Sequence, residues 1–123
     1  MESASSNRAH AIELGKLLSA YQGIDTTVID LTGQSSFTDY FVITTVRSTA
    51  HLQGLVRRIG EYVDQVDLDV LGNLKRPGES GWHLIDCGAL IIHLMTKEMR
   101  EFYELEKVWF EAEQISIEEQ GLQ

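Results

Sequence analysis

The spacing of apolar residues along the chain changes between a helical period and a strand period, and the helical period predicts three helices. We expect the first helix to begin after a cap at residues 5–7 and to end near Gly23. The second helix is expected to run from a cap at Ser48 to about Val66, because its apolar residues recur at spacings of three and four. A third helix is predicted over residues 97–112.

Segments rich in β-branched and aromatic residues predict two pairs of strands between these helices. The first pair covers residues 26–32 and 39–46, which are joined by a turn at residues 33–36. The second pair covers residues 82–86 and 89–95, which a tight turn connects. These segments place strands on both sides of the second helix.

The stretch before the second pair has a weaker pattern. Residues 68–74 favour a short strand, and Pro77, Gly78 and Gly81 indicate an exposed loop after it. A polar tail follows the third helix.

The order of elements is helix, two strands, helix, two or three strands, and helix. It predicts a single small α/β domain, in which helices flank one mixed β-sheet. We expect this domain to occupy residues 1–112 and a loose, acidic tail to occupy residues 113–123. A chain of 123 residues has the size of one domain and can bury a stable core without metals or disulfides.

The net charge of the chain indicates which classes of partner it can bind. The chain has 10 Lys and Arg against 19 Asp and Glu, a net charge of −9. Nucleic-acid binding usually needs a basic patch, so we expect no dominant nucleic-acid contact. Acidic proteins are steered towards basic surfaces instead. Residues 97–123 hold eight acids and three bases, which fits either a solvated helix face or a surface for a basic protein.

The location of the protein is predicted from what the sequence lacks. No basic segment followed by an apolar one marks a secretion signal at the N-terminus. The longest apolar stretch covers residues 89–92, whereas a membrane helix needs about 20 residues. We therefore expect no membrane association and residence in the cytoplasm.

No catalytic, metal or cofactor motif is recognisable. The glycines never form a phosphate loop, and the four His residues lack metal-ligand spacing. The single cysteine, Cys87, is expected to be a packing residue in the tight turn. We therefore predict no cofactor, no metal and no enzymatic activity.

Nucleotidyltransferases provide the alternative for a small α/β domain of this order. Those enzymes need clustered carboxylates to hold a divalent metal. Here the acids in the predicted strands stand singly, so the catalytic carboxylates of a nucleotidyltransferase-like fold are missing. A divergent enzyme that uses Asp39, Asp86 and His93 is the remaining catalytic hypothesis.

Strand alternation defines a candidate binding face on residues 82–95. One side of this strand pair is apolar and predicts core packing. The other side mixes large apolar with polar side chains: Trp82, Leu84, Asp86, Ile91, His93 and Met95. This mixture is typical of a protein-binding hot spot. The alternative is that a helix covers the face and that Asp86 and His93 form a buried hydrogen-bonded pair.

Aromatic residues gather on the third predicted helix as well. They are too many for one narrow stripe, so at least one is expected to be exposed or to meet a partner: Phe102, Tyr103, Trp109 and Phe110.

Four stretches of the sequence together match the pattern of a known family. They are residues 33–43 with the string Thr-Asp-Tyr-Phe-Val-Ile, Ser48 with His51, residues 82–93 with Trp-His-Leu-Ile-Asp-Cys-Gly and a later His, and residues 100–109. On these residues the chain resembles the ribosomal silencing factors, also called iojap-like proteins, over nearly its whole length. The resemblance implies a nucleotidyltransferase-like α/β fold without catalysis.

The resemblance also implies a partner and a mechanism. It implies binding to the large ribosomal subunit through ribosomal protein L-fourteen, which blocks subunit joining and represses translation, with an effect on ribosome biogenesis. The contact surface of the family corresponds here to seven residues: Trp82, Leu84, Asp86, His93, Tyr103, Glu106 and Trp109. The same exposed apolar face allows a homodimer when the protein is free.

Overall fold

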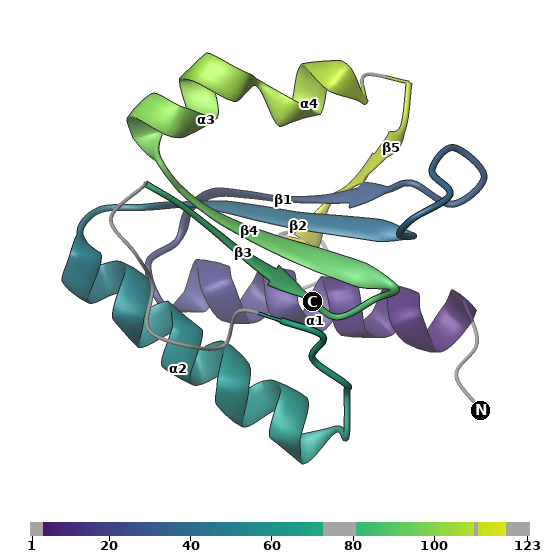
Figure 1. The fold of residues 1–123 in the computed structure, drawn as a ribbon, viewed down its shortest axis with the longest axis horizontal. Coiled ribbons are helices and arrows are strands. Elements are labelled where there is room, and N and C mark those ends of the chain that lie inside the picture. Colours follow the sequence, from purple (N-terminus) through teal and green to yellow (C-terminus); the bar gives the residue numbers. More distant parts are fainter. Residues whose placement is uncertain (1–3, 73–80, 110, 118–123) are drawn as a thin grey trace.

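A computed structural model describes residues 4–72, 81–109 and 111–117. Figure 1 shows one β-sheet between two helical layers, with α1 and α2 on one face and α3 and α4 on the other. The elements are α1 (Ala4–Ala20), β1 (Ile24–Asp30), β2 (Tyr40–Val46), α2 (Thr49–Gln65), β3 (Trp82–Asp86), β4 (Leu90–Thr96), α3 (Lys97–Tyr103), α4 (Leu105–Val108) and β5 (Glu113–Ile115). The predicted α/β class is confirmed.

The sheet has the strand order β3-β4-β2-β1-β5. The pair β2 and β4 is parallel, from Tyr40 opposite Leu90 to Val46 opposite Thr96. The other pairs are antiparallel, so the sheet is mixed as predicted. The strand β2 lies in the centre, and all seven of its residues are buried. β3 and β5 are the edges of the described sheet.

Two clusters of apolar residues lie on opposite faces of the sheet. The larger cluster packs α1 and α2 against the sheet and includes Leu14, Leu55, Ile85 and Leu94. The smaller cluster lies below α3 and α4, where Trp82, Leu84, Leu105 and Trp109 pack against buried sheet residues. Alternation therefore separated the two sides of the β3–β4 hairpin correctly. The side predicted as a binding face is itself largely core, because Ile91, His93 and Met95 are buried.

The ends of the first two helices follow their local sequence. The hydroxyl of Ser48 accepts a hydrogen bond from the backbone N–H of His51 at 3.1 Å, which is the predicted cap of α2. The helix α1 begins at Ala4, earlier than expected, and is closed by Gly23, whose N–H donates to the Leu18 carbonyl at 2.8 Å.

The C-terminal part of the chain differs from the predicted single helix over residues 97–112. Glu104 adopts a left-handed conformation, with φ 50° and ψ 55°, and separates α3 from α4. Apolar spacing alone does not encode this break, because the residues on both sides still reach the same sheet face. The chain then leaves the helical layer and returns to the sheet as β5.

The expectation of a loose tail from residue 113 is wrong for its first five residues. β5 pairs with β1, and Ile115 and Ile117 are buried in the larger cluster. The acidic and polar neighbours of these two residues make the segment look like a tail in the sequence, so the sequence pattern does not predict the short strand. Pairing with β1 supplies the stability that three residues cannot supply alone.

The strand suggested for residues 68–74 is also wrong over its described part. It is reduced to an isolated bridge between Gly72 and Asp86. Pro77 and Gly78 lie outside the described residues. Gly81 has a φ of +84° and directly precedes β3, in agreement with the predicted end of a loop.

Candidate functional site

A continuous row of aromatic rings crosses the sheet face that carries α3 and α4. Its central rings are Phe41 on β2 and His93 on β4, whose centroids are 4.4 Å apart. From His93 the row continues through Trp82 at 5.8 Å to Tyr103 at 4.7 Å and Phe102 at 4.9 Å. In the other direction Phe41 contacts Trp109 at 6.3 Å. These distances are typical of interacting aromatic pairs.

His93 is the buried centre of this row, with 3% of its surface exposed. Its Nδ1 accepts a hydrogen bond from the indole Nε1 of Trp82 at 3.0 Å, so the imidazole proton resides on Nε2. Burial lowers the pKa of His93 to about 4, which keeps the ring neutral. Nε2 has no hydrogen-bond partner within the described structure.

The row reaches the surface at Phe37, which is 60% exposed and lies 6.3 Å from Phe41. It also reaches the surface at three rings of β3 and α3, which we call the aromatic corner: Trp82, Phe102 and Tyr103. Phe102 is 76% exposed and Tyr103 is 44% exposed, whereas Trp82 is half-buried. Such large apolar side chains grouped on a surface are typical of contacts with another macromolecule. The helix α3 therefore covers the binding face predicted from alternation only in part.

Five of the seven predicted contact residues lie along this row or beside it. Trp82, Tyr103 and His93 are members of the row, Leu84 lies opposite His93 in the register of β3 and β4, and Trp109 stands perpendicular to Phe41. The structure thus brings together residues that are 27 positions apart in the sequence.

Asp86 lies apart from these five, at the opposite end of β3 from Trp82. Its Oδ1 accepts a hydrogen bond from the backbone N–H of Gly88 at 2.8 Å and fixes the tight turn. A hydrogen-bonded pair of Asp86 and His93, the alternative considered for this face, is not formed. His93 is bonded to Trp82 instead.

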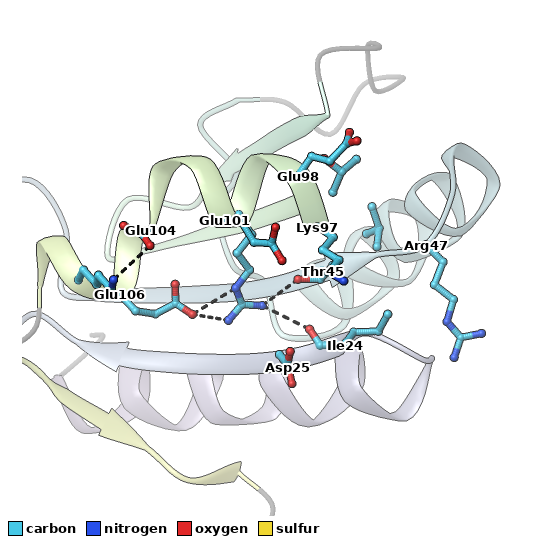
Figure 2. Close-up of a pocket in the computed structure, with 13 residues that line it drawn as sticks. Ile24, Asp25, Thr45, Arg47, Lys97, Glu98, Glu101, Glu104 and Glu106 are labelled. Atoms are coloured by element: carbon cyan, nitrogen blue, oxygen red, sulfur yellow. Dashed lines mark hydrogen bonds and ion pairs between the residues drawn. The ribbon is translucent and has the colours of Figure 1, made fainter.

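Glu106 also lies apart from the row, because it binds Arg100 (Figure 2). The Arg100 side chain is 11% exposed and stands at a cavity of about 980 Å³ between α3, α4 and the ends of β1 and β2. No pattern in the sequence singles out Arg100. A lone arginine between glutamates is typical of a solvated helix, and its acceptors on β1 and β2 are more than 50 positions away.

Two kinds of catalytic group are relevant to the described residues, a metal site and a reactive thiol. Among the described residues, no group of three or more His, Cys, Asp and Glu side chains could hold a metal ion. Asp39, Asp86 and His93, the residues of the catalytic hypothesis, therefore form no such group. Burial raises the pKa of the Cys87 thiol to about 11, and a thiol with that pKa is a poor nucleophile. In the parts of the chain that the structure covers, no helix is long and apolar enough to span a bilayer.

Comparison with known proteins identifies the family. Residues 4–123 match the family model described as ribosomal silencing factor during starvation. That description is of a regulatory factor and not of an enzyme, in agreement with the prediction of a non-enzymatic protein. The chain is 32% identical over 88 residues to the ribosomal silencing factor RsfS of Bacillus subtilis, covering 72% of this chain and 74% of the relative.

Two further relatives are longer than the matched region. The chain is 36% identical to the mouse protein named mitochondrial assembly of ribosomal large subunit protein 1, covering 78% of this chain and 43% of that protein. It is 31% identical to RsfS of Zymomonas mobilis, covering 72% of this chain and 65% of the relative. The chain thus spans less than two thirds of either protein.

Two crystal structures share the fold. A Chromobacterium violaceum protein superimposes with a TM-score of 0.73 at 23% identity, covering 88% of this chain and 87% of the other. A Bacillus halodurans protein gives a TM-score of 0.71 at 19% identity, covering 88% and 98%. Together with the match over residues 4–123, these findings show that the chain belongs to the ribosomal silencing factor family.

Proposed function

We propose that this protein acts in the cytoplasm by binding the large ribosomal subunit through ribosomal protein L-fourteen. The bound protein then blocks joining of the small subunit and represses translation. Membership of the silencing-factor family supports this proposal. The name of the mouse relative, which refers to assembly of the large subunit, supports an additional role in subunit biogenesis.

The aromatic corner is the single observation that carries this proposal. Trp82 and Tyr103 are held ring against ring, so little side-chain entropy is lost when a partner covers them. Exposed Glu98 and Glu101 lie on the same helix as Tyr103, and the net charge of the chain is −9. A basic protein surface with an apolar recess is complementary to this corner.

Steric exclusion needs no chemical step, which fits a site without catalytic groups. A protein bound at a subunit interface prevents joining as long as it stays bound. The relevant quantity is therefore the dissociation rate, which in most interfaces is governed by a few well-packed aromatic anchors.

Sedimentation of the protein with separated ribosomal subunits tests the proposal. We expect co-migration with the large subunit and loss of joined ribosomes. Tyr103→Ala should weaken binding by about thirtyfold, since truncating a hot-spot aromatic residue costs about 2 kcal/mol. Binding of this variant at wild-type affinity would remove the aromatic corner as the contact site.

Tyr21→Ala is the matched control. Tyr21 is 43% exposed, like Tyr103, but it lies just beyond the end of α1, and its ring packs against Arg58 of α2. We expect this variant to bind as wild type does. Trp82→Ala is less suitable as a first test, because Trp82 also holds His93 and its loss disturbs the buried row.

The free protein is proposed to pair with itself through the same corner. Such a homodimer would compete with the ribosome for one surface. Analytical ultracentrifugation should then show a dimer that Tyr103→Ala dissociates and Tyr21→Ala does not.

A further inference from the structure

We infer that Arg100 and Glu106 are positioning residues that hold the aromatic corner in its binding conformation. The inference rests on the proposed function, because ribosome binding is one of its measurements. It assigns to Glu106 an internal role in place of the direct contact expected from the sequence. It also gives Arg100 a role that the sequence analysis does not identify.

The guanidinium of Arg100 uses all five of its N–H groups. Nε and Nη2 donate to the same carboxylate oxygen of Glu106, at 3.1 and 2.5 Å. Nη1 donates to the backbone carbonyl of Ile24 at 3.3 Å and to the hydroxyl of Thr45 at 3.1 Å, and Nη2 donates to the hydroxyl of Thr27 at 3.1 Å. One side chain of α3 is thereby bonded to α4, β1 and β2 (Figure 2).

This arrangement leaves Arg100 no donor for a ligand. The cavity beside it is lined by side chains of both charges, among them Asp25, Arg47 and Lys97. Because every N–H of the guanidinium already has an acceptor, the group is built to join segments of the protein and not to capture an anion.

The helices that Arg100 joins are too short to be stable without contacts to the rest of the protein. α3 has seven residues and α4 has four, whereas isolated helices shorter than about 12 residues are marginal in water. Between them lies Glu104 in the left-handed conformation, which is unfavourable for a residue other than glycine. The angle between α3 and α4 therefore depends on contacts with the sheet, and the Arg100–Glu106 pair spans this break.

The break connects directly to the aromatic corner. Tyr103 immediately precedes Glu104, and its ring lies against Trp82. Trp109 follows α4, and its ring stands against Phe41 at the other end of the row. A change in the angle at Glu104 moves both rings relative to the sheet, so the ion pair fixes the two ends of the row together.

Arg100→Lys tests this role while keeping the charge. An ammonium group is compact and cannot reproduce the planar fork that reaches acceptors on three elements. If the corner is then correctly formed in about one molecule in ten, the affinity for the large subunit falls about tenfold. Glu106→Gln is the second variant, which keeps the shape and removes the charge.

Arg8→Lys is the matched control. Arg8 on α1 donates to Asp30 on β1 at 3.1 Å, an ion pair on the opposite face of the sheet. We expect Arg8→Lys to bind large subunits within twofold of wild type, even where its melting temperature falls as far as that of Arg100→Lys. Equal affinities of the two variants for the large subunit would overturn the inference.

The near-UV circular dichroism of the Trp82–Tyr103 contact is a readout that a general loss of stability does not change below the melting transition. We expect Arg100→Lys and Glu106→Gln to reduce this signal at 10 °C and Arg8→Lys to leave it intact. If the wild-type protein failed to bind ribosomes, the proposed function would be wrong. The circular dichroism signal would still show whether Arg100 and Glu106 position the aromatic corner. A wild-type spectrum in both variants would disprove the positioning role. If Arg100→Lys does not fold, the spectrum of Glu106→Gln alone decides whether the positioning role holds.

Discussion

The indole N–H of Trp82 donates to Nδ1 of His93, so an edge strand is joined to a buried strand by side chains as well as by backbone. The bond requires an unprotonated Nδ1. Protonation of His93 would place two N–H groups against each other in a site from which water is excluded. The half-buried ring of the aromatic corner and the neutral state of a buried histidine are thus coupled.

This coupling predicts a loss of stability in mild acid. Burial lowers the pKa of His93 from 6.5 to about 4, so between these values the unfolded chain binds a proton that the folded chain does not. The free energy of unfolding should therefore be fully retained above about pH 6.5 and should fall as the pH decreases towards 4, by up to about 1.4 kcal/mol per pH unit from this group. Urea unfolding at pH 7, 6 and 5 measures the slope.

The control for this measurement is His93→Gln, whose amide oxygen can still accept from Trp82 but does not titrate. Its stability should depend less steeply on pH over the same interval. An unchanged slope would show that another group is responsible.

The burial of Ile117 predicts that the segment after α4 is required for stability. Ile117 is buried against Gly15 of α1, and its neighbour Ser116 is exposed. Ile117→Ala should reduce the free energy of unfolding by about 2–5 kcal/mol, the usual cost of truncating a buried isoleucine. Ser116→Ala should change it by less than about 0.5 kcal/mol. Equal urea midpoints for Ile117→Ala and the wild-type protein would show that residues 113–117 do not contribute to stability.

Local sequence patterns predict interactions between residues that are close in the chain, and long-range interactions leave no such pattern. Alternation is a local property, so it placed Trp82, Leu84 and His93 on one face correctly. The break at Glu104 arises because residues on either side of it must meet different parts of the sheet. The Arg100 network connects residues up to 76 positions apart, and no pattern within the helix reports its acceptors.

The close approach of Gly23 to the sheet predicts that a methyl group cannot be added there. A Cβ atom at Gly23 would lie 2.3 Å from the hydroxyl oxygen of the buried Thr44 and 2.7 Å from the carbonyl oxygen of Leu18. Gly23→Ala should therefore cost about 1–3 kcal/mol. Thermal unfolding measures this loss, and a neutral result would contradict the packing of α1 against β2.

Gly54 provides the opposite case within the same chain. It lies inside α2, and a Cβ atom there would meet nothing within 4 Å. Gly54→Ala should raise the free energy of unfolding by about 0.5–1 kcal/mol, because alanine loses less backbone entropy in a helix. If Gly23→Ala lowers the free energy of unfolding and Gly54→Ala raises it, the two effects, steric conflict and helix propensity, are distinguished. Changes of the same sign would contradict this assignment.

The state of Cys87 predicts slow reaction with thiol reagents. The thiol is buried, and its pKa is raised to about 11, first by burial and then by the charge of Asp86. We expect the native protein at pH 8 to react with a disulfide reagent only at the rate of local opening, and the unfolded protein to react at once. Immediate labelling of one thiol in the native state would contradict this burial.

The pairing of β1 with β5 has a consequence for synthesis of the chain. The strand β1 can pair with β2 once residues up to 46 have emerged, but its other neighbour is made some 70 residues later. Throughout that interval the nascent chain carries an open strand edge, which other chains can extend into aggregates. A strand of three residues completes the described sheet only after it too has left the exit tunnel, and translational pausing between β2 and β5 would prolong the vulnerable state.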